Sequence, residues 1–426
     1  MINQESLAAV EAARFSTQFM RPIYEGYGFA QIPQTIRYCL TDSEQKGVPF
    51  GERDDLYQKY DAVVLLFVDA FGWRFFEHYH QRSPFLQRAV EQGLVSKLTS
   101  QFPSTTAAHV TTIHTGLPVG ESGVYEWYYY EPLLDRMIAP LLFSFAGDTD
   151  RDTLKATGVA AQALYPAQTL YQELQPHGVD SVVFQHLSYA HSPYSKIVTN
   201  GARMVPYRTL PEALVNLGQL LERQKRRSYY FMYVDTIDTI CHRYGPDAPQ
   251  TAAEIEAFLA IMELIFHSNL ASKKQRTLFL LTADHGQIAI DPTTTIYINQ
   301  RFPEMLPFLA TNRAGQPLAP AGSSRDMFLH IKDAYLDQAQ AFLQQALAGR
   351  AEIYRVQELI DQGFFGTRSP SPAFMSRVGN LVILPYAHET VWWYEAGRFE
   401  QKFYGSHGGL SRDEMETPLL ALPYGY

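Results

Sequence analysis

Acidic residues closely follow three apolar segments of the chain, and histidines stand beside two of them. Asp69 follows AVVLLFV, Asp238 lies just beyond YYFMYV, and Asp284-His285 follows TLFLLTA. An aspartate after a strand often caps the next helix, which explains any single case without a functional site. Three cases together offer carboxylate oxygens and imidazole nitrogens, the ordinary ligands of zinc. The pattern therefore predicts a metal site.

The spacing within two of these segments indicates how their side chains are presented. Asp238 and His242 are four residues apart, so a helical turn places both on one side. Asp284 and His285 are adjacent, and adjacent side chains in a strand point to opposite faces. Both can serve one site only if the strand has already ended, and Gly286 suits the sharp turn that this requires.

A threonine-rich segment lies between the first and second acidic segments. The sequence FPSTTAAH, which ends at His109, leads into a helical run up to Thr115, and Gly116 suits the end of that helix. A helix capped by serine or threonine explains this segment without any chemistry. The alternative places a threonine hydroxyl at a helix N-terminus that favours an anion, where beside a metal it would ionise and attack phosphorus.

Continuous apolar runs predict the strands that position these residues, because strands of a parallel sheet are buried on both faces. The expected strands are residues 62–68, 181–185, 229–234, 277–282 and 381–384. Helical patterns lie between them, most clearly at 211–225 and 252–269. Alternating strands and helices predict an α/β fold with a mostly parallel central sheet and helices on both faces. The acidic segments then meet at the carboxyl ends of the strands, where such sheets bind ligands.

The sequence predicts one catalytic domain over residues 1–426 with a small inserted subdomain at 295–375. Prolines and glycines are frequent in the inserted segment, a helix is expected at about 333–347, and Pro-Ser-Pro near Pro370 suits a boundary.

Composition excludes some classes of function. The 426 residues carry a net charge of -9, which argues against binding a nucleic-acid duplex. A phosphate substrate remains compatible, because bound metals reverse the local sign of charge. We find no signal sequence and no apolar run long enough to span a membrane. The only cysteines are Cys39 and Cys241, so we expect no disulfide framework and a cytoplasmic location.

Five segments, taken in order, resemble the alkaline phosphatase superfamily and, within it, the type I phosphodiesterase and nucleotide pyrophosphatase family. The segments are VVLLFVDAFG, FPSTTAAHVTTIHTGLPVGESGVYEW, YVDTIDTICHRYGP, LLTADHGQ and GSHGG, the last around His407. They extend from about residue 61 to 410. The resemblance implies an alkaline-phosphatase-like fold and hydrolysis of phosphodiester or pyrophosphate bonds in a small phosphorylated, nucleotide-like substrate.

The resemblance also implies two divalent metal ions, which we expect to be zinc, with manganese as the alternative. It assigns the nucleophile to Thr106, which would form a covalent phosphoenzyme. The ligand sets that it implies are Asp238, His242 and His407 for one metal, and Asp69, Asp284 and His285 for the other.

The chain departs from the family pattern beside the nucleophile. Where the family usually has an asparagine that donates to a phosphate oxygen, this chain has Ala108. His109 follows directly and is a candidate substitute donor, although a buried structural histidine explains it equally well. Trp127, in the aromatic run after Glu126, is a candidate for stacking against the leaving group, while a place in the core is the alternative. A second departure is Cys241, where glycine is usual.

Two other functions remain open at this point. The same metal site suits a phosphomonoesterase or a phosphonate hydrolase, and a basic cluster around the phosphate would favour the monoester. A binding protein that keeps the fold without catalysis is the other alternative, although all seven predicted metal-binding and nucleophile positions are filled. The sequence gives neither the physiological substrate nor the oligomeric state.

Overall fold

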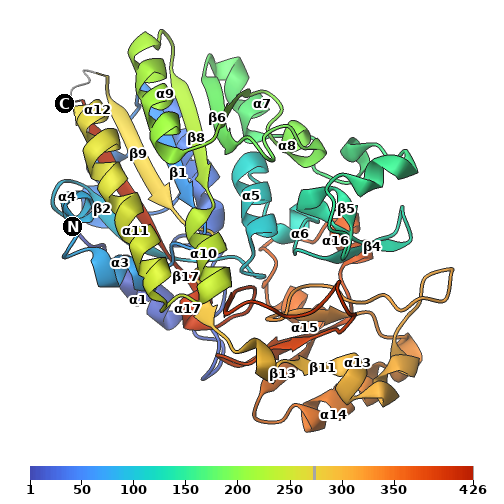
Figure 1. Cartoon of the computed structure of the whole chain (residues 1–426). Coiled ribbons are helices and arrows are strands. Elements are labelled where there is room, and N and C mark those ends of the chain that lie inside the picture. The colour runs from blue at the N-terminus through green and yellow to red at the C-terminus, as the bar shows by residue number, and fades with distance from the viewer. Residues whose placement is uncertain (272–274, 426) are drawn as a thin grey trace.

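A seven-stranded sheet forms the centre of the computed structural model, which describes residues 1–271 and 275–425 (Figure 1). The strand order is β2-β17-β9-β1-β8-β6-β7. The strands are β1 (Ala62–Val68), β2 (Leu94–Thr99), β6 (Asp180–His186), β7 (Arg203–Tyr207), β8 (Ser228–Val234), β9 (Thr277–Thr282) and β17 (Glu416–Tyr424). All neighbouring pairs are parallel except those of β17, which runs antiparallel to β2 and β9. The predicted mostly parallel α/β fold is therefore confirmed.

Helices cover both faces of this sheet, and alternate residues of β1 enter separate cores. Val63, Leu65 and Phe67 belong to one apolar cluster, and Val64 and Leu66 belong to the other. The first cluster includes residues of α2 (Ile32–Leu40), α5 (Thr106–Thr115) and α7 (Leu170–Leu174). The second includes residues of α3 (Trp73–Tyr79), α4 (Pro84–Gln92), α9 (Leu210–Arg223), α10 (Thr236–Tyr244) and α11 (Pro249–Ile261). Burial on both faces explains why β1 has a continuous apolar sequence.

The carboxyl ends of four strands meet at one edge of the sheet. β1, β8 and β9 are parallel, and β2 points the same way because both β2 and β9 are antiparallel to β17. α10 begins directly after β8, and α5 follows β2 after a short loop. In Figure 1 this edge faces the orange segment below the main sheet.

That lower segment contains a small antiparallel sheet of order β12-β14-β13. Its strands are β12 (Met327–Leu329), β13 (Ala351–Arg355) and β14 (Leu381–Pro385), and α14 (Leu336–Ala346) lies beside β13. The expectation that residues 381–384 belong to the main sheet is wrong. β14 is fully buried as the central strand of the small sheet, so its apolar run has the same appearance as a strand of a parallel sheet.

The bounds of the predicted inserted subdomain stay a prediction. The segment at 295–375 contains β12, α14 and β13, together with β11 (Ile296–Tyr297), α13 (Ile298–Arg301), α15 (Val356–Asp361) and the start of α16 (Pro372–Arg377). Its contacts continue beyond residue 375, because β11 pairs with β15 (Val391–Trp392) and β12 pairs with β14. No helix of the described residues is long and apolar enough to cross a membrane.

Three strands of the main sheet carry no clear signal in the sequence. β2 includes Ser96 and Lys97, and the ammonium of Lys97 lies 2.8 Å from Glu416 at the start of β17. β17 contains two prolines, and β7 is an edge strand that is mostly half-buried. Polar residues and prolines weaken the apolar run that predicts a strand.

We predict that Phe67→Ala destabilises the fold by about 3–5 kcal/mol, because Phe67 is fully buried in β1 against Phe29, Phe231 and Tyr233. Urea unfolding measures the change. Leu133→Ala is the control, since Leu133 is 65% exposed and its truncation should cost less than about 0.5 kcal/mol. Equal effects of the two substitutions would contradict the assignment of Phe67 to the core.

Candidate active site

Asp69, Asp284 and His285 form a buried cluster at the carboxyl ends of β1 and β9. The Nε2 atom of His285 lies 3.5 Å from Asp69 Oδ1 and 3.3 Å from Asp284 Oδ2. The backbone amides of Ala70 and His285 donate to Asp284 Oδ1 at 3.1 and 3.0 Å. β9 ends at Thr282, so Asp284 and His285 lie beyond the strand and both reach one site, as their spacing required.

Gly286 is needed at this point for close packing. A Cβ atom there would lie 2.1 Å from the carbonyl oxygen of Asp413, so any side chain would clash with backbone. Gly286 does not have the positive φ of a glycine turn. The prediction that a sharp turn requires glycine here is therefore wrong, and close packing requires it instead.

Thr106 is the first residue of α5 and lies directly beside this cluster. Its hydroxyl oxygen is 3.3 Å from Asp69 Oδ2 and 3.2 Å from His285 Nε2. The threonine is 8% exposed, and Thr105 precedes it as the N-cap residue in extended conformation. Gly116 ends the helix with a φ of 74°, as predicted. A hydroxyl is thus held at a helix N-terminus among groups that bind cations.

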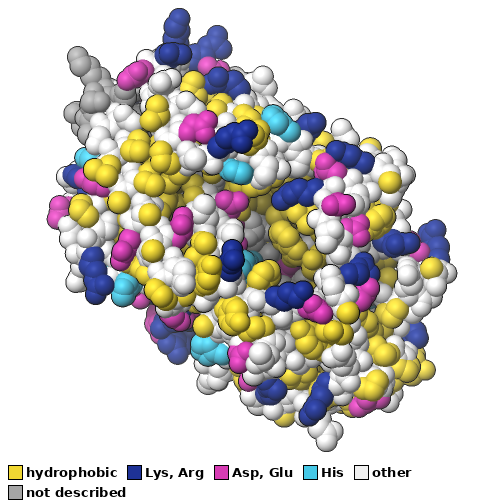
Figure 2. All heavy atoms as spheres, viewed as in Figure 1, with side chains coloured by type: hydrophobic (Ala, Val, Ile, Leu, Met, Phe, Trp, Pro, Cys, Tyr) yellow, Lys and Arg dark blue, Asp and Glu magenta, His cyan; other side chains and the backbone are white. Residues whose placement is uncertain are grey.

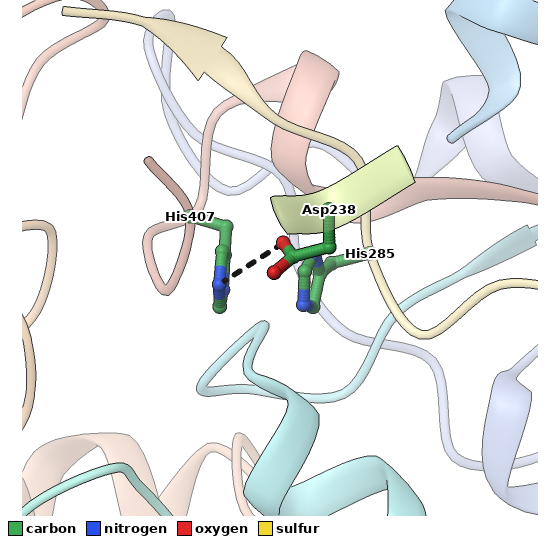
Figure 3. Close-up of side chains that lie close together, drawn as sticks. All are labelled: Asp238, His285 and His407. Carbon is green, nitrogen blue, oxygen red and sulfur yellow. Dashed lines mark ion pairs between the residues drawn. The ribbon is translucent and has the colours of Figure 1, made fainter. Parts of the chain in front are cut away.

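Asp238, His242 and His407 lie on the other side of His285. Asp238 and His242 lie on α10, and the distances from Asp238 Oδ1 are 3.4 Å to His242 Nε2 and 3.8 Å to His407 Nε2. Figure 3 shows Asp238, His285 and His407 converging from separate segments. The rings of His285 and His407 stack with centroids 3.6 Å apart. The two predicted ligand sets therefore form one continuous group.

Each of the three histidines presents the same ring nitrogen to this group. The Nδ1 atoms of His242, His285 and His407 contact the carbonyl oxygens of Gly405, Gly286 and Ser104, at 2.8, 3.0 and 3.0 Å. A carbonyl oxygen only accepts, so Nδ1 carries the hydrogen in each ring. The lone pair is then on Nε2, which faces the carboxylates. Backbone contacts of this kind orient the histidine ligands of metals.

The electrostatics of the group call for a cation. Burial, with Asp284 and Asp238 nearby, raises the pKa of Asp69 well above its ordinary value. Burial raises the pKa of Asp284 to about 7, and burial lowers the pKa of His285 and of His407 well below the ordinary value. In the described part of the chain, Asp69 Oδ1 and Asp284 Oδ2 are buried without a hydrogen-bond partner. Carboxylate oxygens that have no hydrogen-bond donor, and neutral imidazoles with a free lone pair on Nε2, suit divalent metal ions.

The sequence pattern of the type I phosphodiesterase / nucleotide pyrophosphatase family matches residues 63–410. The chain belongs to this family. Over 249 residues it is 23% identical to ectonucleotide pyrophosphatase/phosphodiesterase family member 3 of Rattus norvegicus. That match covers 57% of this chain and 27% of the relative, so the chain spans about a quarter of the length of the curated relative.

Solved structures of family members share the fold. Murine ectonucleotide pyrophosphatase/phosphodiesterase 5 matches with a TM-score of 0.61 at 15% identity, over 84% of this chain and 87% of that chain. Phosphonoacetate hydrolase from Sinorhizobium meliloti matches with a TM-score of 0.59 at 17% identity, over 84% of this chain and 89% of that chain. These neighbours place the chain in the alkaline-phosphatase-like fold, as expected.

Two side chains that support the group in this phosphodiesterase family member were not predicted. The hydroxyl of Tyr233, near the end of β8, donates to Asp69 Oδ2. The amide of Gln287 donates to Asp238 Oδ1 at 2.5 Å. Gln287 directly follows the Asp-His-Gly motif, so its position in the sequence indicates a role near the site. Tyr233 lies within an apolar run and gives no such indication.

His109 and Ala108 do not contact the space beside Thr106. His109 is fully buried, with Nδ1 2.7 Å from the Thr105 carbonyl and Nε2 2.9 Å from both the Gln101 amide and the Ser100 hydroxyl. Both ring nitrogens are engaged within the protein, so the hypothesis that His109 contacts substrate is wrong. Ala108 lies in the apolar core and likewise lines neither of the cavities described next.

Two cavities meet at Thr106, and Trp127 lines both. The larger, of about 460 Å³, has an aromatic lining that includes Trp127, Tyr128 and Trp392. The smaller, of about 210 Å³, is lined by the polar residues Arg151, Gln185 and Ser192 and also by Tyr189, Tyr194 and Tyr233. In Figure 2 the corresponding face is hollowed near its centre, with hydrophobic side chains along the hollow. The candidate role of Trp127 is compatible with this position.

We predict a pH-dependent difference in stability between the metal-free wild type and Asp284→Asn. With the Asp284 pKa raised to about 7, the folded state keeps a proton that the unfolded chain releases above about pH 4. Wild type should therefore lose stability relative to the variant as pH rises from 5 to 7, by on the order of 1 kcal/mol per pH unit. Urea unfolding in chelator measures this difference. A constant difference across that range would contradict the burial of an ionisable Asp284.

Proposed function

We propose that the protein is a metal-dependent hydrolase of phosphodiester or pyrophosphate bonds, with Thr106 as nucleophile. The observation that carries the proposal is the position of the Thr106 hydroxyl, within 3.3 Å of both Asp69 and His285 at the start of α5. Membership of the family supports the same class of reaction. The alternative of a fold retained only for binding gains no support, because every predicted ligand and the nucleophile lie together.

We assign two divalent cations, zinc by the donor set, to the buried group. Asp69, Asp284 and His285 would hold the cation beside Thr106. Asp238, His242 and His407 would hold the other, and the ring of His407 stacks on that of His285 from the first set. When bound, such ions neutralise phosphate charge and lower the pKa of a coordinated hydroxyl. The mixture of imidazole and carboxylate ligands is typical of zinc, and manganese remains the alternative.

The chain's own groups account for the attack on phosphorus. Asp69 accepts from the Thr106 hydroxyl and holds its oxygen in one place, which lowers the entropic cost of reaching the reactive geometry. Amides at the first turn of α5 point toward the space where the anionic phosphate would lie. The Thr106 oxygen forms a bond to phosphorus while the alcohol or phosphate leaving group departs. Water then hydrolyses the phosphothreonine and restores the hydroxyl.

The two cavities favour a substrate with a group on each side of the phosphorus. Thr106 lines both cavities, so one substituent of a diester fits the larger, aromatic cavity while the other fits the smaller cavity. A nucleotide-like group suits the aromatic cavity, and an inactive variant of the murine neighbour has been solved in complex with AMP. A phosphonate is the second candidate, because phosphonoacetate hydrolase shares the fold and binds phosphonoacetate. A monoester or small phosphonate would leave one of the cavities empty.

We predict that Thr106→Ala reduces hydrolysis of bis-p-nitrophenyl phosphate by at least about 1,000-fold, because it removes the nucleophile. Zinc binding measured by calorimetry should persist, since Thr106 is not assigned as a ligand. Thr106→Ser is the matched control, which keeps a hydroxyl and should retain measurable turnover. Full activity of the alanine variant would exclude Thr106 as nucleophile.

Substrate preference is tested at Trp127, which lines both cavities. Wild type should prefer the diester to p-nitrophenyl phosphate, and Trp127→Ala should raise KM for the diester by roughly 10-fold through loss of aromatic contact area. A wild-type preference for the monoester would move the protein to the phosphomonoesterase alternative and overturn the diester assignment.

A further inference from the structure

Glu126 and Asp326 are two fully buried carboxyl groups next to the aromatic cavity. Their segments run side by side, because the Gly322 amide donates to the Tyr128 carbonyl at 2.7 Å. The side chains of Glu126 and Asp326 are within hydrogen-bonding reach of each other. Neither residue belongs to the ligand sets assigned above.

One oxygen of each carboxyl group has a protein donor. Glu126 accepts from the Trp127 amide through Oε2. Asp326 accepts from the amide and the hydroxyl of Ser323 through Oδ1, at 3.0 and 2.5 Å. Among described residues, the other two oxygens, Glu126 Oε1 and Asp326 Oδ2, are buried without a partner. Because the two side chains lie within hydrogen-bonding reach, two ionised carboxylates would repel each other, whereas one shared proton removes that repulsion.

The electrostatic surroundings agree with a retained proton. Burial raises the pKa of Glu126 to about 8. Burial, followed by the nearby charge of Glu126, raises the pKa of Asp326 well above its ordinary value. Other charged and titratable groups that interact with the pair include Glu414, which is itself paired with Arg325, and the phenols of Tyr125 and Tyr128.

The pair connects the two segments that carry Thr106 and His407. On one side, Glu126 lies within hydrogen-bonding reach of the side chain of Thr105, the residue before the proposed nucleophile. On the other, the Ser323 hydroxyl that contacts Asp326 lies 3.3 Å from the His407 carbonyl oxygen. Gly408 packs so closely here that a Cβ atom would lie 2.8 Å from Asp326 Oδ1.

We propose that Glu126 and Asp326 share one proton and act as a positioning pair that holds the Thr106 segment and the His407 loop in register. This inference rests on the proposed function. Neither carboxyl group takes part in the reaction itself. Their effect on catalysis is through the placement of Thr106 and of a metal ligand.

The fixed donors make single and double amide variants differ sharply. In Glu126→Gln, the amide oxygen must face the Trp127 amide, so its NH₂ group donates to Asp326. In Asp326→Asn, the oxygen must face Ser323, so its NH₂ group donates to Glu126. Each single variant thus keeps the bond without a shared proton. In the double variant the two NH₂ groups face each other, and the bond is lost.

The experiment measures zinc affinity by calorimetry and kcat/KM for bis-p-nitrophenyl phosphate at pH 7. Each single amide variant should stay within about threefold of wild type. The double variant and Glu126→Ala should lose roughly 10- to 100-fold in both quantities, as partners of metal ligands do. Glu121→Gln, the same chemical change outside the cavity, is the matched control. Additive effects of the two single substitutions in the double variant would overturn the proposal.

A pH series gives a second measurement that requires only the wild type and Glu126→Gln. Loss of the shared proton between pH 7 and 9 should weaken zinc binding by the wild type relative to the variant, which has no such proton. An unchanged ratio would also overturn the proposal. Zinc affinity tests the shared proton independently of the proposed function. A protein without phosphodiesterase activity would still show the pH-dependent difference in zinc binding between wild type and Glu126→Gln.

Discussion

The meeting of three carboxyl groups at one edge of the sheet is the constraint on which the rest of the site depends. Burial raises the pKa of Asp69, Asp238 and Asp284, and the nearby charge of Asp238 raises the pKa of Asp69 and of Asp284 further. Protons or cations must neutralise them. The orientation of the histidines favours cations over protons, because His242, His285 and His407 all present the lone pair of Nε2 toward the carboxylates. Such an arrangement is built for cations.

The sheet satisfies this constraint by bringing distant segments to one place. β1 and β9 deliver Asp69 and Asp284 directly, and β8 delivers Asp238 through the first turn of α10. The antiparallel strand β17 begins at this edge, whereas the parallel strands end there. The segment that precedes β17 therefore brings His407 to the strands that hold the other ligands. β2 ends at the same edge and leads to Thr106. One reversed strand therefore completes a site that parallel strands alone would leave open.

The sequence predicted the parts of this arrangement that depend on local order along the chain. A carboxylate after a buried strand and an i, i+4 pair on a helix are properties of short segments, so the positions around Asp69 and Asp238 could be read directly. Contacts between distant segments could not. The run that forms β14 has the same appearance in either sheet, and the direction of the His109 ring depends on Ser100 and Gln101. The convergence of the candidate ligands on one sheet edge was thus predictable, while the contacts that support them needed the fold.

Buried carboxyl groups near the site are neutralised in three ways, which differ in what the reaction can use. Glu414 is fully buried with both oxygens 2.9 Å from the guanidinium of Arg325, a permanent charge that fixes the loop after His407. Glu126 and Asp326 have no such cation, and a shared proton suffices to hold them. Among the described residues, Asp69 and Asp284 likewise have no arginine and no donor on one oxygen each, but the Nε2 atom of His285 lies 3.5 Å from Asp69 and 3.3 Å from Asp284. Imidazole lone pairs beside carboxylates suit a cation, so under the proposed function this group binds the exchangeable ion and the other two support its geometry.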